Sequence, residues 1–284
     1  MSFSTYITDK AGLQKFYEAV IGSHSTYAPV EKFGKYDFKK VASLSECDPD
    51  SPIAKTMSIK PLFFPKSAKI LKYTATSAGT EVSDTTGDPL AEKRVILGAK
   101  HCDARGLQVL DQVYKWDYID TDYQKRRENT VIVSTRCDKA ETHCFCTSLD
   151  YDVENLDALD VAIVNGEGGK IYLQARTEKG EHFLKTVDGG LKTADGGAAE
   201  DMKKQYKAFE SSFRLKMDYK EINEKMQDKF ESEAFEAVSA NCVSCNTCAF
   251  VVPPAIASRC RTKRSRTQAC VTRATTPAIT FILR

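Results

Sequence analysis

Long hydrophobic runs are missing from this sequence of 284 residues. None approaches the roughly 18 consecutive apolar residues that a membrane-spanning helix needs, which argues against an integral membrane protein. The N-terminal segment has no basic stretch followed by an apolar one, so we expect no secretory signal and a cytoplasmic protein. A nucleophile elbow, a P-loop and a GxGxxG motif are also missing, so the usual sequence signals of hydrolases and nucleotide-binding sites are absent.

The composition itself is that of a soluble globular protein. Hydrophobic residues make up 42% of the chain and charged residues 28%, and both fractions are ordinary for that class. The length suits one large domain or two smaller ones, each with its own core.

Ten cysteines are the exception in this composition. A disulfide scaffold is typical of short secreted chains, and this chain is neither short nor recognisably secreted. Clustered thiols in a cytoplasmic protein more often bind metal ions or iron–sulfur centres. The cysteines form two groups and three isolated positions, namely Cys102, Cys137, Cys144 and Cys146, then Cys242, Cys245 and Cys248, and finally Cys47, Cys260 and Cys270.

Basic charge is concentrated at the C-terminal end. The chain has a formal net charge of +2, but residues 251–284 contain seven Lys or Arg and no acidic residue. The 34 basic and 39 acidic residues of 1–250 therefore give that part a net charge of −5. A basic tail usually suggests nucleic acid or an anionic membrane. We expect neither partner here, and aromatic residues for base stacking are nearly absent from the tail.

Amphipathic segments predict several helices. Apolar residues recur at helical spacing from Leu13 to Ile21, and Thr8 or Asp9 can cap this helix. Asp103 can cap a second helix, and the Lys/Glu-rich residues 198–238 predict further helices.

Short apolar runs predict buried strands at 95–97, 131–133, 161–164 and 171–173. Residues 61–73 are expected to form a loop and then a strand, and 75–90 a surface loop. Buried strands that alternate with helices predict an α/β fold with a partly parallel mixed sheet.

The first cysteine group follows the ends of two predicted strands. Cys102 lies in the turn between a strand and the next helix, Cys137 lies just past the end of another strand, and Cys144 and Cys146 follow closely. If these strands are parallel neighbours, all four thiols converge at the carboxyl edge of the sheet, where open α/β sheets place their ligands.

Two interpretations of this group stay open. Four thiolates suit a [4Fe–4S] cluster or a zinc ion, with His101 and His143 as outer donors or spare ligands. The alternative is four scattered buried thiols that act as small hydrophobic side chains. The C-x-C spacing of the last two cysteines favours a ligand pair.

The second group is the opening of the bacterial ferredoxin run, C-x2-C-x2-C-x3-C-P. A loop with this spacing can wrap three thiolates round one face of a cubane cluster. The run then breaks, because Val252 stands where the fourth cysteine is required, although Pro253 is in place. The alternative is a structural zinc knuckle with Cys260 as a distant fourth ligand.

A frameshift would explain why the motif and the composition fail at the same point. If one nucleotide is missing from codon 251, the restored frame permits Val-Cys-Pro-Thr-Cys-His-Cys-Phe, which completes the run. Cys260 and Cys270 would then belong to the shifted frame. The alternative is a natural, divergent basic tail. We expect residues 251–284 to be disordered, because they have too little patterned apolar surface to offset chain entropy.

Four segments of the chain resemble a known family. They are Pro61–Pro65 (PLFFP), Gly98–Arg105 (GAKHCDAR), Tyr123–Thr130 (YQKRRENT) and His143–Ser148 (HCFCTS). They are similar to the beta subunit of cytoplasmic sulfhydrogenases, which are NAD(P)-linked nickel–iron hydrogenases, and to the related A subunit of anaerobic sulfite reductase. The resemblance extends over roughly residues 50–250.

The resemblance implies an α/β domain followed by a ferredoxin-like domain with two [4Fe–4S] clusters. It implies electron transfer between a flavin- and NAD(P)-binding subunit and a catalytic hydrogenase or sulfite reductase subunit, with no nucleic acid or membrane partner. Family members usually continue to a second ferredoxin run. Without that run a cluster at Cys242, Cys245 and Cys248 lacks a ligand, whereas the Cys102 group matches the family at every cysteine.

These observations predict three parts of the chain. Residues 1–197 form an α/β domain with the four-cysteine site, 198–238 a helical connector, and 239–284 a truncated ferredoxin-like α+β segment with an aberrant basic tail. The predicted function is that of an iron–sulfur electron-transfer subunit of a multisubunit oxidoreductase, in which the cofactor supplies the redox chemistry. The alternative is a zinc-stabilised structural or scaffold subunit. A third hypothesis makes the tail a nucleic-acid-binding arm, whose affinity would fall steeply with salt.

Overall fold

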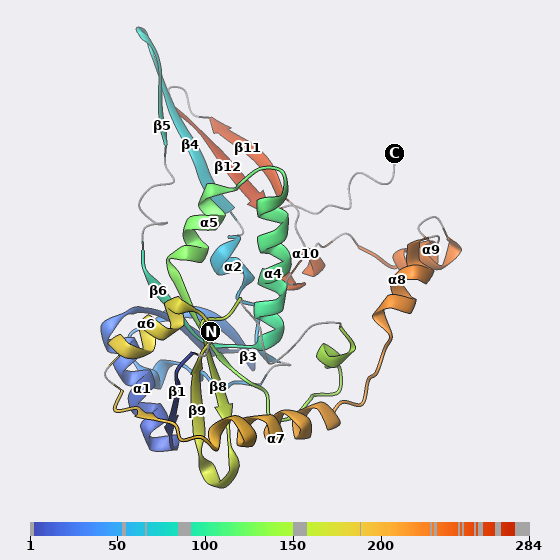
Figure 1. Ribbon diagram of the computed structural model, residues 1–284. Coiled ribbons are helices and arrows are strands. Elements are labelled where there is room, and N and C mark those ends of the chain that lie inside the picture. The colour runs from blue at the N-terminus through green and yellow to red at the C-terminus, as the bar shows by residue number, and fades with distance from the viewer. Residues whose placement is uncertain are drawn as a thin grey trace.

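The computed structural model describes residues 3–52, 55–65, 67–84, 92–149, 158–187, 189–227, 229, 232–243, 245, 247–252, 254, 258–264 and 268–275. Its main body is a mixed sheet with helices on both faces (Figure 1). This arrangement confirms the predicted α/β class. Among the described helices, none combines the length and the apolar character that crossing a membrane requires.

The large sheet has eight strands in the order β10-β1-β9-β8-β7-β6-β2-β3. In chain order they are β1 (Thr5–Thr8), β2 (Ser25–Lys32), β3 (Lys35–Val41), β6 (Arg94–Ala99), β7 (Thr130–Thr135), β8 (Val161–Asn165), β9 (Ile171–Ala175) and β10 (Lys192–Thr193). Strands β2, β6, β7 and β8 are parallel neighbours, and the outer pairs are antiparallel. The prediction of a partly parallel mixed sheet is therefore confirmed.

Helices cover both faces of this sheet. One face packs against α1 (Lys10–Ser23) and α6 (Glu178–Thr186). The other packs against α2 (Lys60–Phe63), α4 (His101–Trp116), α5 (Thr121–Glu128) and the start of α7 (Ala198–Ser211). The alternation of β6 serves both cores, because Val95 and Leu97 face the first group of helices and Ile96 faces the second.

Of the two predicted helix starts, the structure confirms one and contradicts the other. Helix α1 begins as expected, since the Asp9 side chain accepts a hydrogen bond from the Gly12 amide at 2.8 Å. The prediction that Asp103 caps the next helix is wrong, because α4 begins two residues earlier, after Lys100. Asp103 lies in the first turn of this helix and is buried, and burial raises the pKa of its carboxyl to about 6, against the lowering effect of Ser58 and of the backbone of Lys100 and Ile59.

A second, four-stranded antiparallel sheet lies beside the main body, with strand order β11-β12-β4-β5. Its strands are β4 (Ser67–Thr76), β5 (Gly79–Asp84), β11 (Ser258–Arg264) and β12 (Gln268–Thr275), and Figure 1 shows it at the top. The expected loop over 75–90 is therefore wrong for its first part, while 85–90 lie outside the described residues. The expected disorder of 251–284 is also wrong for β11 and β12, because β12 pairs with β4 and β11 pairs with β12, and these ladders satisfy backbone groups of both strands.

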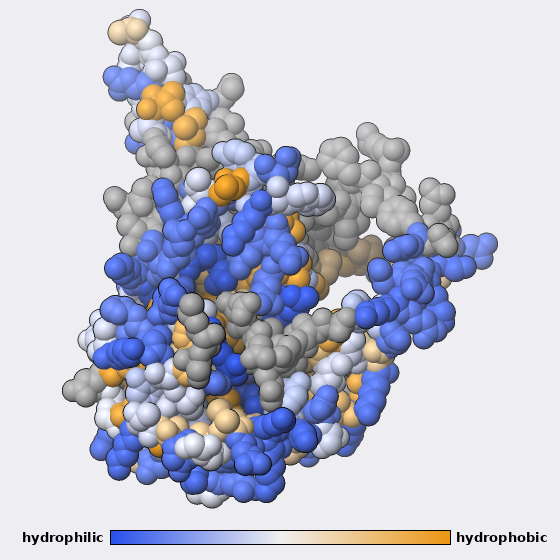
Figure 2. Space-filling view, viewed as in Figure 1, coloured by the Kyte–Doolittle hydropathy of each residue, from blue (hydrophilic) through white to orange (hydrophobic). Residues whose placement is uncertain are grey.

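The last described helices lie away from the sheet (Figure 1). They are α8 (Tyr219–Gln227), α9 (Glu233–Ser239) and α10 (Thr247–Val251). Helices α8 and α9 have no buried residue, and Figure 2 shows mainly hydrophilic surface in this region.

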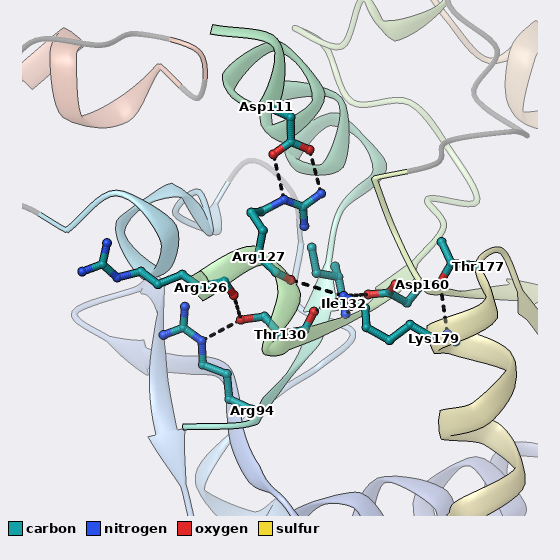
Figure 3. Close-up of polar contacts among 10 residues, drawn as sticks. Arg94, Asp111, Arg126, Arg127, Thr130, Ile132, Asp160, Thr177 and Lys179 are labelled. Atoms are coloured by element: carbon teal, nitrogen blue, oxygen red, sulfur yellow. Dashed lines mark hydrogen bonds and ion pairs between the residues drawn. The ribbon is translucent and has the colours of Figure 1, made fainter. Parts of the chain in front are cut away.

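A polar network fixes the amino ends of β6 and β7 (Figure 3). The carboxylate of Asp160 accepts the Ile132 amide at 2.8 Å and the Thr177 hydroxyl at 2.7 Å. Lys179 Nζ donates to the Thr130 carbonyl at 2.6 Å and lies 3.3 Å from the Asp160 carboxylate. Arg94 Nε donates to Thr130 Oγ1 at 2.8 Å. These contacts hold in place the two strands whose opposite ends lead to the cysteines.

Candidate metal centre

The candidate centre lies where β6 and β7 end. Cys102 is in the first turn of α4, directly after β6, and Cys137 follows β7 by two residues. Because β6 and β7 are parallel neighbours, their carboxyl ends meet at one edge of the sheet. Cys144 precedes, and Cys146 begins, the short 3-10 helix Cys146–Ser148 of the following loop.

The structure brings these four thiols close enough to act on one another. Burial raises the pKa of Cys102 well above its ordinary value, and the neighbouring Asp103 and the thiols of Cys146, Cys137 and Cys144 raise it further. Burial likewise raises the pKa of Cys137 to about 11, against the lowering effect of Lys100. Without a cation the thiols of Cys102 and Cys137 thus stay protonated, and binding a metal would release their protons.

An aromatic cover shields this cluster from one side. Phe209 and Phe213, at the end of α7 and just beyond it, are buried and meet edge-to-face with ring centroids 4.9 Å apart. Three of the four thiols pack against this pair, namely those of Cys137, Cys144 and Cys146. Two hydrogen bonds anchor the cysteine loop: the Ala140 amide donates to Ser212 Oγ at 2.8 Å, and the Met217 amide donates to Ser148 Oγ at 3.0 Å.

The donor set suits either a single ion or a larger group. In the described part of the chain, no three His, Cys, Asp or Glu side chains are arranged to hold one metal ion. Thiolates round one zinc ion must lie within about 4 Å of each other, since each Zn–S bond is about 2.3 Å. A [4Fe–4S] cluster is bound through four separate irons, so its thiolates stand farther apart. Four neighbouring, half-buried thiols match the number of thiolate ligands that such a cluster takes.

The two histidines beside the set differ in their surroundings. His143 is exposed. His101 is buried, and neither of its ring nitrogens has a hydrogen-bond partner among the described residues. Burial lowers the pKa of His101 to about 3, and Arg136, Arg176 and Lys100 contribute to the lowering, so its ring is neutral at physiological pH.

Two cations near the thiols were not anticipated from the sequence. Lys100 and Arg136 are buried although both are basic, and they directly follow β6 and β7. Positive side chains at this edge favour an anionic ligand set such as a thiolate-bound cluster. The position of a single basic residue immediately after each strand is the only sequence signal that could have identified them.

The second cysteine group lies in different surroundings. Cys242, Cys245 and Cys248 are all exposed, and Cys245 Sγ lies 3.4 Å from Thr247 Oγ1. Hydrogen bonds from Thr247 lower the pKa of Cys245. Val252, which stands at the position of the missing fourth cysteine, accepts a hydrogen bond from Lys60 Nζ at 3.1 Å through its carbonyl, whereas Pro253 lies outside the described residues.

Among the isolated cysteines, Cys47 lies in the core apart from both groups. Cys47 is half-buried against the core, its thiol lies 3.7 Å from the Leu44 carbonyl, and burial raises its pKa to about 11, as for an ordinary core thiol. Cys260 and Cys270 lie on β11 and β12.

Comparison with known proteins yields one relationship. No family model matches the chain. The chain is similar to the sulfhydrogenase 2 subunit beta of Pyrococcus furiosus, with 28% identity over 235 residues, which is 80% of this chain. The aligned part spans 65% of that relative. The likeness is that of a distant homologue and supports a relationship at the level of the family.

Proposed function

We propose, on the premise of this distant homology, that the chain is an iron–sulfur electron-transfer subunit of a cytoplasmic multisubunit oxidoreductase. The convergence of Cys102, Cys137, Cys144 and Cys146 at one sheet edge is the observation that supports it. A bound [4Fe–4S] cluster would supply one-electron chemistry. The chain's own residues would ligate it, exclude water through Phe209 and Phe213, and balance its charge through Lys100 and Arg136.

The partners follow from the same proposal. Electrons would pass between a flavin- and NAD(P)-binding subunit and a catalytic hydrogenase or sulfite reductase subunit. We further propose the division into residues 1–197, 198–238 and 239–284. Helix α7 packs on the main sheet, so the proposed connector, residues 198–238, would be attached to the α/β domain at its start. Its later part, α8 and α9, would be exposed.

Metal analysis of anaerobically purified protein tests this function. We expect about four irons and four acid-labile sulfides per chain from the Cys102 group, with the absorption and electron paramagnetic resonance spectra of a [4Fe–4S] centre. Cys137→Ser should abolish most of the bound iron. Cys47→Ser is the matched control, because it removes a half-buried thiol outside the group and should leave the iron content unchanged.

Two other results would decide against the proposal. Stoichiometric zinc without sulfide would support the zinc-stabilised scaffold instead. Equal iron content in wild type and Cys137→Ser would place the cluster elsewhere. A Cys245→Ser variant then reports separately on the second group, because iron that depends on it would belong to the broken ferredoxin run.

A further inference from the structure

A pocket of about 250 Å³ lies between the sheet and the first turns of α7. Three cationic residues line it, namely Arg136 after β7, Arg176 after β9 and Lys203 on α7. Gln174 adds a neutral polar side chain, and no carboxylate occurs among the described lining residues. A concave site lined by three positive side chains attracts anions.

The buried surroundings of the pocket strengthen this attraction. Arg136 is buried, and its guanidinium carbon lies 5.8 Å from the centroid of the Tyr206 ring. Asp201, the nearby acid of α7, points elsewhere, since it accepts the Tyr172 hydroxyl at 2.8 Å and the Glu167 amide at 3.1 Å. Charges attract an ion more strongly where water is partly excluded.

We propose that this pocket binds a small phosphate-type oxyanion. Two guanidinium groups present planar forks that match phosphate oxygens, and a lysine adds a mobile point charge. The anion can be free phosphate or the phosphate of a nucleotide, and both share the chemistry that these residues recognise. Anion binding here goes beyond the proposed electron transfer, but the two sites share Arg136, which precedes Cys137, and α7 leads from the pocket to the aromatic cover of the thiols.

Calorimetric titration of the full chain tests the proposal. The protein is titrated with inorganic phosphate, and separately with adenosine monophosphate, in buffers held at one ionic strength with sodium chloride. We expect saturable binding at one site per chain. Lys203→Gln should weaken it about tenfold, the loss expected for one charge-assisted hydrogen bond. Lys203 is exposed, so this variant should fold normally.

Lys15→Gln is the matched control, because it makes the same charge change on the exposed face of α1 and should leave binding unchanged. Arg176→Gln is the second variant and should weaken binding at least as much as Lys203→Gln. Tighter binding of the nucleotide than of phosphate would identify the nucleotide as the source, and similar affinities would identify free phosphate. Absence of saturable heat with both anions would overturn the proposal, as would an equal loss in Lys15→Gln.

Discussion

At the scale of single residues, the ion pair of Arg127 with Asp111 joins α5 to α4 (Figure 3). The guanidinium donates to both carboxylate oxygens at 2.9 Å, and Tyr123 Oη donates to the same carboxylate at 2.7 Å. The side chains of Arg127 and Asp111 are only 16% and 20% exposed. Removing one partner of a bidentate pair in such surroundings destabilises the fold far more than breaking an exposed pair does, because the remaining charge is left partly buried without a counterion.

Removing the charge of Asp111 should therefore destabilise the protein. We expect Asp111→Asn to lower the free energy of unfolding by about 2–4 kcal/mol, since Arg127 would stay buried without its counterion. Urea unfolding at neutral pH measures this change. Lys40→Gln is the control, because it breaks the more exposed pair with Glu92 and should cost less than about 1 kcal/mol. Equal costs for both variants would contradict this account.

The same pair gives a pH dependence. Burial alone would raise the pKa of Asp111, but the hydrogen bonds and charge of Arg127 outweigh it and hold the pKa below its ordinary value. A carboxylate whose pKa is lowered by folding stabilises the fold above its unfolded pKa of about 3.9, and this stabilisation is lost as the pH falls. The difference between wild type and Asp111→Asn should thus shrink below about pH 4.

At the scale of elements, Gly98 shapes the end of β6 that leads to Cys102. Its φ is +78°, and a Cβ there would lie 2.4 Å from the Pro49 carbonyl oxygen. The pairing of β6 with β7 shifts register at this residue, between Leu97 and Ala99. Such a bulge bends the strand and redirects the chain beyond it.

Gly98→Ala should destabilise the protein by more than about 2 kcal/mol, because both the backbone conformation and the close contact exclude a side chain. Gly22→Ala is the matched control: Gly22 is exposed on α1 with open space around its Cβ position, and alanine there should stabilise by about 0.5–1 kcal/mol. Thermal unfolding followed by circular dichroism measures both. If Gly98→Ala left the thermal stability unchanged, the bulge would be able to relax around a side chain, and this account would be wrong.

Helix α7 connects the main sheet to the cysteine loop, because Phe209 and Phe213 at its end pack against that loop. Phe209→Ala should remove cover from the thiols, lower stability by about 3 kcal/mol, and speed the reaction of Cys137, Cys144 and Cys146 with a thiol reagent in metal-free protein. Mass spectrometry of the labelled peptides measures the rate at each cysteine. Phe33→Ala is the control, because Phe33 is 94% exposed, and unchanged labelling in Phe209→Ala would remove the proposed shielding role.

At the scale of the whole molecule, β11 and β12 extend the sheet formed by β4 and β5. The frameshift hypothesis concerns the same part of the chain. We expect resequencing of the gene across codons 245–262 to reveal one further nucleotide at codon 251 and the cysteines of a complete ferredoxin run. If the codons stand as translated, the hypothesis is wrong, and the basic residues that lie on β11 and β12 belong to the fold.

Sequence patterns were sufficient for the parallel strands and for the convergence of Cys102 and Cys137. Each buried strand is marked by a local apolar run, and the loops after parallel strands meet at one edge of the sheet. The proximity of these two cysteines is therefore predictable from local signals combined with one topological rule.

Tertiary structure alone decided the features that depend on distant partners. The mixed charges of 125–128 predict an exposed face that could also dock a partner; Lys125 and Glu128 are indeed exposed, whereas Arg127 is only 16% exposed and pairs with Asp111 of another helix. Strand β12 forms because it pairs with β4, which lies nearly 200 positions earlier in the chain. The cationic pocket likewise unites three separate segments. Local sequence cannot encode such pairings, because their stability comes from groups that only the folded chain brings together.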